Sequence, residues 1–566
     1  MNDTNRRLFL TIAICLAVVY GWSMLFQPQR PAPRDPSSAS QQTPAPGGQP
    51  PAVPAAAGVP RGTEAAARPQ GADAPARQVP RLPAQELALD SDKLHLVLST
   101  DGGVLKSALL KGAKFRKSAE KSKETAQVDL VSAATLPFPL STEIRGPEAA
   151  APALVPADAA YEVVRHDGRS AVLRTKAGAL TLTKTFSLDP STYRLDMKLD
   201  VQSTGPLMGQ LLVLETGHGE APSGGMFSSR ATPGQTICQA GGKLERVATG
   251  AKHASWDGPG AASFAGIDEQ YFLDALVVDT ESKATCHLEA QPGGTLIASI
   301  ALPLSLSAGG QTSWALKNFL GPKDTDELVA VAAPLREAVD FGFWSVIASF
   351  LLAVMKFFYK AVPPHNWGVA IILLTVAVKV VTFPLQHRSM KSMQEMQRIQ
   401  PQLEEMKKKF AGDSQRQNLE QMKLFKEHGV NPMGSCLPMV IQMPVWFALY
   451  KTLGVSVELY NSVFIPGWLN DLTARDPYFV LPVAMGVTMI ATQVLTPSPM
   501  SNPGQKTIGY VMSGFFSLFM LNIPSGLTLY IFVNNILSIA QQIYLRRTMG
   551  GPPAASRTVA VTPQRA

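Results

Sequence analysis

The chain has 566 residues, of which 46% are hydrophobic and 17% are charged. Soluble globular domains average about 25% charged residues, so these proportions count against an ordinary soluble enzyme. The formal net charge of +8 falls in clusters beside apolar segments, and such clusters of lysine and arginine set the orientation of membrane proteins. The composition therefore favours a membrane protein over one that binds a specific nucleic-acid sequence.

The N-terminal segment, residues 1–26, places two arginines ahead of an uncharged apolar run from Leu8 to Phe26. Such a run fits either a cleaved signal peptide or a retained transmembrane anchor. We favour the anchor, because the run is longer than a usual signal-peptide core and no small-x-small site follows it closely. Residues 27–89 are rich in proline, alanine, glycine and glutamine, and their few large apolar side chains predict a disordered tether.

Residues 90–330 show the period-two alternation that is typical of strands with one solvated face. In KLHLVLST the apolar residues are Leu94, Leu96 and Leu98, and YRLDMKLDV repeats the pattern. Turns rich in glycine, proline, aspartate and serine separate further short runs, with few helical candidates between them. The pattern predicts a large antiparallel all-β sandwich.

The β region contains few residues in patterns that are typical of a catalytic site. Cys238 and Cys286 could pair in an oxidising compartment or stay unpaired, because the sequence does not give their distance. No histidine here sits in a recognisable motif, and each is better explained as structural than catalytic; they are His95, His166, His218, His253 and His287. The sequence has no metal-ligand spacing, nucleophile elbow or nucleotide-binding loop, so it predicts no catalytic residue, metal or cofactor.

Long apolar segments follow. Residues 331–366 are rich in aromatic side chains and include Lys356 and Lys360, which suits an amphipathic helix at the membrane interface better than a span. Pro524 breaks the last apolar stretch, which is too long for one crossing and so predicts a tight helical hairpin. The candidate spans are residues 367–385, 434–456, 477–496, 507–522 and 525–545.

The positions of lysine and arginine predict the orientation. Nine of them lie between residues 387 and 430, and the tail from residue 546 holds four arginines and no acid. The positive-inside bias places both segments, and the N-terminal arginines, in the cytoplasm. The result is a six-span path that exports the tether and the β region to a periplasm, with residues 547–566 as a basic cytoplasmic tail.

Lys379 is the only charge in the stretch WGVAIILLTVAVKVVTFPL, residues 367–385. A lysine near the middle of a bilayer costs about 2.5 to 3.5 kcal/mol on translocon-based scales. Its side chain could snorkel to the lipid headgroups. Alternatively, and in our preferred interpretation, it faces a water-filled recess together with Thr375, where its charge attracts an acidic or polar ligand.

Other polar residues of the spans are most simply explained as interhelical hydrogen bonds; they are Gln442, Gln493, Asn534, Asn535, Gln541 and Gln542. No aspartate or glutamate lies deep in a predicted span, so an ion-coupled transporter would lack its usual carboxylate. Two alternatives nevertheless stay open. One is a small-solute transporter, and the other is a membrane-anchored carbohydrate-active enzyme with a histidine and a carboxylate converging in the β region.

Residues 387–430 predict a cytoplasmic hairpin of two charged helices broken at AGD. An apolar stripe at helical spacing runs along it, formed by Met390, Met393, Met396, Ile399, Leu403 and Met406. Such a stripe is most often the seam of the hairpin itself. Because methionines also form adaptable binding surfaces, the four methionines are the candidate docking residues.

Four stretches, NWGVAIILLTVAVKVVTFPL, GVNPMGSCLPMVIQMPVWFALY, DPYFVLPVAMGVTM and IPSGLTLYIFVNN, together resemble the YidC membrane-protein insertases, relatives of the Oxa and Albino proteins. The anchor, tether and β region resemble the long Gram-negative form. The resemblance implies a five-span insertase core over residues 367–546 and an exported β-supersandwich without known catalysis. It also implies a protein that moves hydrophobic segments of nascent proteins from the cytoplasm into the inner membrane, alone or beside the Sec translocon.

In that family a hydrophilic groove among the core spans carries a positive residue in its first helix. Lys379 occupies this position, where Gram-negative members usually carry arginine. By the same resemblance, Thr375 and Tyr530 match positions that touch the passing chain, and Gln442 matches a groove-lining glutamine. The implied partners are nascent membrane proteins, the Sec translocon and membrane lipids, and the basic tail is similar to tails proposed to approach the ribosome.

Overall fold

The computed structural model describes residues 83–116, 127–131, 137–146, 152–219, 234–248, 255–291, 294–410, 412–429, 437–495 and 503–548. The predicted anchor, nearly all of the tether and the basic tail lie outside these residues. The first strand begins at Glu86, inside the segment that composition assigned to the tether. This boundary is corrected because Leu87 and Leu89 alternate with exposed residues and are buried.

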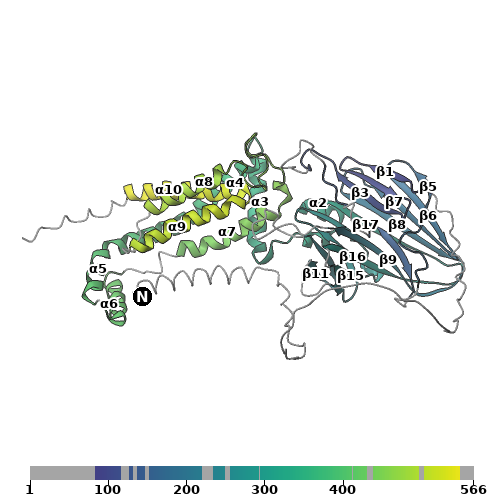
Figure 1. Cartoon of the computed structure of the whole chain (residues 1–566), viewed down its shortest axis with the longest axis horizontal. Coiled ribbons are helices and arrows are strands. Elements are labelled where there is room, and N and C mark those ends of the chain that lie inside the picture. Colours follow the sequence, from purple (N-terminus) through teal and green to yellow (C-terminus); the bar gives the residue numbers. More distant parts are fainter. Residues whose placement is uncertain are drawn as a thin grey trace, which may run out of the picture. The chain divides into compact units, whose positions relative to one another are not determined.

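The described strands form three antiparallel sheets (Figure 1). The three-stranded sheet consists of β1 (Glu86–Asp90), β2 (Leu94–Ser99) and β3 (Val104–Leu110). The nine-stranded sheet has the order β11 (Lys243–Ala248), β10 (Gln235–Ala240), β13 (Ala262–Asp268), β14 (Phe272–Val277), β17 (Gln311–Pro322), β8 (Arg194–Ser203), β7 (Leu180–Leu188), β6 (Ser170–Ala177) and β5 (Glu162–His166). The five-stranded sheet has the order β12 (Ser255–Asp257), β15 (Thr285–Ala290), β16 (Thr295–Leu306), β9 (Leu207–Gly219) and β4 (Ser141–Arg145).

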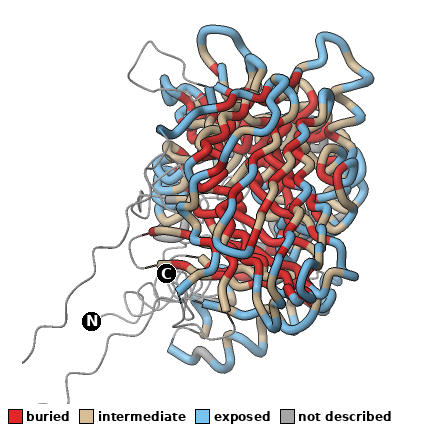
Figure 2. Tube along the Cα trace, turned by 90° about the vertical axis from the view of Figure 1, so that its right-hand side faces the viewer, coloured by how far each residue is buried: buried red, intermediate tan, exposed pale blue. Residues whose placement is uncertain are grey.

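The two larger sheets pack face to face as a β-sandwich, with β10 and β13 contacting β15 and β16. Figure 2 shows the buried residues gathered in the interior and the exposed ones on the surface. Along β8 the side chains of Leu195, Met197 and Leu199 point inward and are buried, while their neighbours are more exposed. The alternation in the sequence therefore predicted both the strand and its buried face, and the sandwich is confirmed.

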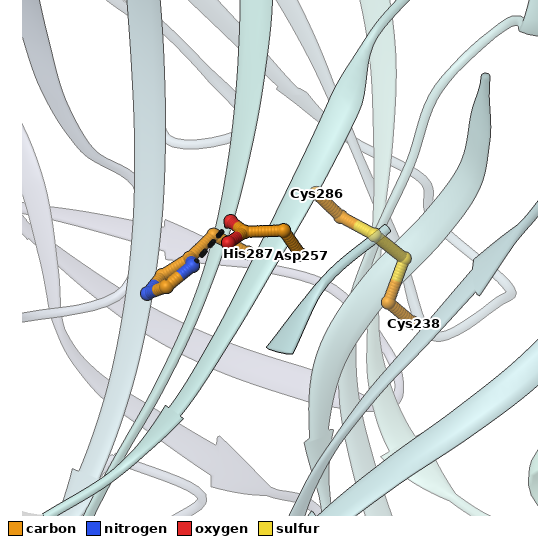
Figure 3. The surroundings of a disulfide bond; sticks show 4 residues. All are labelled: Cys238, Asp257, Cys286 and His287. Carbon is orange, nitrogen blue, oxygen red and sulfur yellow. Dashed lines mark hydrogen bonds and ion pairs between the residues drawn. A yellow bond between two sulfur atoms is a disulfide. The ribbon is translucent and has the colours of Figure 1, made fainter. Parts of the chain in front are cut away.

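A disulfide joins Cys238 on β10 to Cys286 on β15, with 6.6 Å between the Cα atoms (Figure 3). The bond links the nine-stranded sheet to the five-stranded sheet across the core. Beside it, Nδ1 of His287 lies 2.8 Å from Oδ1 of Asp257, which connects β15 to β12. Gly258 has no room for a side chain, because a Cβ there would lie 2.6 Å from Sγ of Cys286. The two cysteines of the β region are thus paired.

Lys184 is fully buried at an inward position of β7. Its ammonium donates hydrogen bonds to the carbonyl oxygens of Gly102, Gly103 and Leu140 at 3.0, 2.9 and 3.1 Å. All three acceptor residues have positive φ angles of 75°, 55° and 65°. Burial lowers the pKa of the Lys184 ammonium to about 7. The lysine thereby holds two left-handed backbone segments against the sandwich.

A second buried charge cluster fixes the chain as it leaves the sandwich. Asp268, at the end of β13, accepts hydrogen bonds from Lys323 Nζ at 2.8 Å and from Arg246 at 2.7 Å. Arg246 also donates to the carbonyl of Glu337 at 2.9 Å. Because Glu337 lies in the short 3-10 helix η2 (Ala333–Ala338), this cluster ties the segment after β17 back to the sheet.

The helices follow β17 in the order α2 (Thr325–Val331), η2, η3 (Gly342–Trp344), α3 (Ser345–Ala361), α4 (Trp367–Arg398), α5 (Gln400–Lys409), α6 (Ser414–Glu427), α7 (Leu437–Val455), η5 (Val457–Leu459), α8 (Val480–Leu495), α9 (Pro503–Phe519), η6 (Met520–Asn522) and α10 (Ser525–Thr548). Helix α4 packs against α3 and α10, and α8 packs against α9 and α10 (Figure 1). Lys356 on α3 pairs with Glu458 of η5 at 2.8 Å. That lysine therefore has a protein partner.

Among the described residues, two helices are long and apolar enough to cross a membrane, Gly342–Ala361 and Trp367–His387. Two shorter apolar helices are Val480–Val494 and Thr507–Asn522. Asparagine and glutamine side chains reduce the hydropathy of α10. The six-span path and the interfacial placement of residues 331–366 therefore stay predictions.

Replacing both cysteines by serine, Cys238→Ser with Cys286→Ser, should lower the free energy of unfolding of the sandwich by about 2 to 4 kcal/mol. The closed loop is 48 residues long, and opening it returns conformational entropy to the unfolded chain. Urea unfolding of the detergent-solubilised chain, followed by the β-sheet circular dichroism, measures the change. The wild type treated with reductant is the control, and an equal urea midpoint for oxidised wild type and variant would contradict the expectation.

Lys184 should make the stability of the sandwich depend on pH. Its pKa of about 7 in the folded chain lies below the ordinary value of 10.5, so between these pH values the unfolded chain binds more protons. Stability therefore rises with pH in this window, by up to about 1.4 kcal/mol per unit. Below pH 7 both states carry the proton and this contribution is flat. Urea unfolding at pH 7 and pH 9 should show a slope that Lys184→Met removes; an equal slope in both proteins would refute the assignment.

Candidate functional site

The candidate site lies where α4 packs against α10. Lys379 on α4 is partly buried, and its ammonium donates a hydrogen bond to Oγ of Ser538 on α10 at 2.7 Å. A longer contact of 3.4 Å reaches Oε1 of Gln386, two turns further along α4. Near the start of both helices, Cδ1 of Ile371 on α4 lies 3.5 Å from the position that a Cβ on Gly526 of α10 would occupy. Since Lys379 and Ser538 meet further along both helices, α4 and α10 run in the same direction. The ammonium is thus directed toward a neighbouring helix.

Polar side chains continue from Lys379 along one face of α4. Nε2 of Gln386 donates to Oγ1 of Thr382 at 3.2 Å, and Thr382 donates to the carbonyl of Val378 at 2.8 Å. The spacing of three and four residues between Lys379, Thr382 and Gln386 puts them on one side of the helix. Thr382, Gln386 and Ser538 were not among the predicted site residues, although this spacing was a usable signal for the two residues on α4.

The other predicted groove residues are Thr375, Gln442 and Tyr530, and they differ in whether their hydrogen bonds join two helices. Thr375 is 1% exposed, and its hydroxyl donates to the carbonyl of Ile371 at 2.7 Å, one turn back on its own helix. Tyr530 is also 1% exposed, and its hydroxyl accepts a hydrogen bond from Nε2 of Gln442 at 2.8 Å. The structure therefore brings Gln442 on α7 and Tyr530 on α10 together, whereas the hydroxyl of Thr375 is used within α4.

Interhelical hydrogen bonds account for further polar residues of the helices. Nε2 of Gln493 on α8 donates to the carbonyl of Gly509 at 2.8 Å and to Oγ of Ser513 at 2.6 Å, both on α9. By contrast, Nε2 of Gln541 and Nδ1 of His387 are buried and have no hydrogen-bond partner within the described residues. Buried polar atoms are rarely left in this condition without ordered water.

The hairpin of α5 and α6 has its own small core, formed by Ile399, Leu403 and Phe425 with Met406 and Leu424 packed against it. The packing of Met406 against this core favours the seam explanation for that residue, and the docking role of the four methionines stays a prediction. Exposed apolar side chains lie instead on α6, where Leu419 is 60% and Met422 is 56% exposed. The side chains of Met390, Met393 and Met396 lie outside the described residues.

The histidines of the sandwich have separate partners. His95 pairs with Asp90 and His166 with the carbonyl of Ala88. His253 lies outside the described residues, which contain no cluster of three histidine, cysteine, aspartate or glutamate side chains able to hold a metal.

His218 is the histidine of the described sandwich that shares a cavity with two carboxylates. His218 lies 3.2 Å from Glu269, and both line a small cavity with Asp274. Asp274 accepts a hydrogen bond from Thr216 at 2.6 Å, and burial raises the pKa of its carboxyl. The cavity has room for about one water molecule. This space is far too small for a sugar.

Comparison with known proteins identifies the family. Residues 86–354 match the model of the YidC periplasmic domain, and residues 357–551 match that of the 60Kd inner membrane protein. The chain is 40% identical over 488 residues to the membrane protein insertase YidC of Anaeromyxobacter sp. (strain Fw109-5), covering 84% of this chain and 87% of the relative. It is 33% identical over 556 residues to the membrane protein insertase YidC of Geobacter metallireducens, covering 97% and 100%. These matches confirm the resemblance, and the chain belongs to the YidC family of membrane protein insertases.

Proposed function

We propose that this insertase passes hydrophobic segments of nascent proteins from the cytoplasm into the inner membrane through a hydrophilic groove beside α4 and α10. The observation that carries the proposal is the hydrogen bond between Lys379 and Ser538, because it directs a cation toward the space between two helices. Thr375, Gln442 and Tyr530 belong to the wall of this groove. Lys379 is the group that attracts the substrate.

In this mechanism no covalent bond is formed or broken, and no nucleotide is needed. A polar flank of the substrate enters the groove, where water and the polar face of α4 reduce its desolvation cost. The ammonium of Lys379 favours flanks that carry aspartate or glutamate. The adjoining apolar segment then moves into lipid, and its transfer from water supplies about 25 cal/mol per Å² of apolar surface.

Two observations support a hydrated groove. The row of Lys379, Thr382 and Gln386 gives the apolar part of α4, residues 367–386, one polar face. The unpartnered atoms of Gln541 and His387 lie beyond Ser538 and Lys379 along the same two helices. Since such atoms usually bind water, they favour water at this end of α4 and α10.

The proposed topology has six spans, with both termini in the cytoplasm and the sandwich in the periplasm. The distribution of lysine and arginine supports it. The disulfide between Cys238 and Cys286 supports it independently, because structural disulfides persist in oxidising compartments and are rare in the cytosol. In this topology residues 387–430, which include α5 and α6, form the cytoplasmic hairpin that receives substrates.

The proposed partners are nascent membrane proteins, membrane lipids, the Sec translocon and, through the basic tail, the ribosome. Leu419 and Met422 give α6 an exposed apolar surface that fits a receiving role. We assign no catalysis to the sandwich. The small cavity that His218 shares with Glu269 and Asp274 lacks space for a carbohydrate substrate.

Charge at position 379 should decide insertion. Lys379→Arg keeps the positive charge and should insert substrates normally, whereas Lys379→Glu repels acidic flanks and should lower insertion at least about tenfold, the factor set by about 1.4 kcal/mol. Protease accessibility of a reporter substrate in a strain depleted of its own insertase measures both. The matched control is Lys317→Glu, the same reversal at an exposed position of β17. Equal insertion by the Arg and Glu variants at position 379 would rule out the proposed role of charge.

A further inference from the structure

We propose that Ser538 is the positioning residue of Lys379: it holds the ammonium between α4 and α10 until an acidic group of the substrate takes its place. This inference rests on the proposed function, in which Lys379 is the attracting charge. Ser538 thereby joins the groove residues, although it was not predicted from the sequence. It also gives the site a resting state and an occupied state.

The hydroxyl of Ser538 is oriented to accept. Its hydrogen is donated to the carbonyl oxygen of Asn534 at 2.7 Å, one turn back on α10. A serine hydroxyl has a single hydrogen and two acceptor lone pairs, so its lone pairs are left for the ammonium of Lys379 at 2.7 Å. Hydrogen bonds linked in this way strengthen one another in a low-dielectric interior. Ser538 is thus a backbone-braced acceptor for the cation.

The second contact of Lys379 shows where the ammonium would go without this acceptor. Oε1 of Gln386 lies 3.4 Å from Nζ, which is at the limit of a hydrogen bond. Gln386 is seven residues further along α4, about 10 Å toward the end that leads to the hairpin. If Ser538 did not hold it, the lysine stem would swing in this direction and snorkel toward the headgroups.

A neutral partner makes the site exchangeable. Within the described residues, Lys379 has no carboxylate partner, since both of its contacts are to uncharged oxygens. A carboxylate binds an ammonium more strongly than a neutral oxygen does, because the Coulomb attraction of opposite charges is added to the hydrogen bond. An acidic flank of a substrate can therefore displace Ser538, whereas a resident carboxylate on α10 would hold the cation permanently.

The test uses the full chain in a depletion strain and two reporter substrates that differ only in carrying two aspartates or two asparagines in the translocated flank. The wild type should insert the aspartate form more efficiently. Ser538→Ala should lose most of this preference because the ammonium leaves the groove, and Ser538→Asp should lose it because the ammonium is held. Ser538→Thr keeps the hydroxyl and should keep the preference. Ser517→Ala is the matched control, since Ser517 makes an interhelical hydrogen bond from α9 to the carbonyl of Pro482 on α8.

A second measurement reads the position of the ammonium without insertion. In inside-out vesicles that contain the full chain, a membrane-impermeant amine-acylating reagent should label Lys379 about tenfold faster in Ser538→Ala than in the wild type, as quantified by mass spectrometry. Ser538→Thr and Ser517→Ala should label at the wild-type rate.

The outcomes separate the two proposals. If Lys379→Met abolishes the preference but Ser538→Ala changes neither preference nor labelling, Ser538 is not the positioning residue and the proposed function stands. If Lys379→Met keeps the preference, the attraction by Lys379 fails, and the displacement of Ser538 by substrate fails with it.

Discussion

A cation inside an apolar helix must find a polar partner, and this requirement organises the helical part of the molecule. Lys379 meets it by reaching across to Ser538, so the contact between α4 and α10 is both a packing contact and an electrostatic one. Gln442 and Tyr530 connect α7 to α10 by the same principle, and Gln493 connects α8 to α9. Because lipid offers no competing hydrogen bonds, a buried polar side chain that reaches a neighbouring helix helps to select that neighbour.

The β-sandwich contains a useful contrast in Lys184. That ammonium is surrounded by three carbonyl oxygens and lies under an aromatic ring, with Nζ 4.9 Å from the ring centre of Tyr161. Its three hydrogens are matched by three acceptors, as a structural cation requires. Lys379 has one short and one long contact to neutral oxygens. A lysine whose three ammonium hydrogens all have acceptors is suited to fixing a fold, whereas one with a single short hydrogen bond still has hydrogens to offer a ligand.

The sequence predicted the parts of the fold that depend on periodicity. Alternation located β2 and β8, and the apolar run around Lys379 located the first part of α4, which continues past the predicted boundary at residue 385 to Arg398. The disulfide was not predictable, since the distance between Cys238 and Cys286 depends on how β10 and β15 face each other across two sheets. The start of β1 was missed because its five residues follow a proline-rich stretch whose composition dominated the assignment.

At the site, sequence reasoning found Lys379 but not its partner. Serine is small and common, and nothing in the sequence distinguishes Ser538 from the neighbouring polar residues of α10. Thr375 illustrates the opposite case, because its spacing from Lys379 indicated a shared face, yet its hydroxyl is bonded within its own helix. Met406 packs against the core of the hairpin, and a stripe of methionines in a sequence does not distinguish a surface for another protein from a contact with the second helix of the hairpin.

The identity of the cation also follows from its surroundings. An arginine presents a planar fork that pairs best with two acceptors side by side, whereas an ammonium is a compact charge that can use a single oxygen. At this position α10 offers Lys379 one hydroxyl, and the second acceptor, Gln386, comes from α4 itself. A lysine therefore suits this pair of helices geometrically. In the proposed mechanism, the groove requires a positive charge held at a defined depth by a partner weak enough to be exchanged, and the chemistry of the partner on α10 determines which cation meets that requirement.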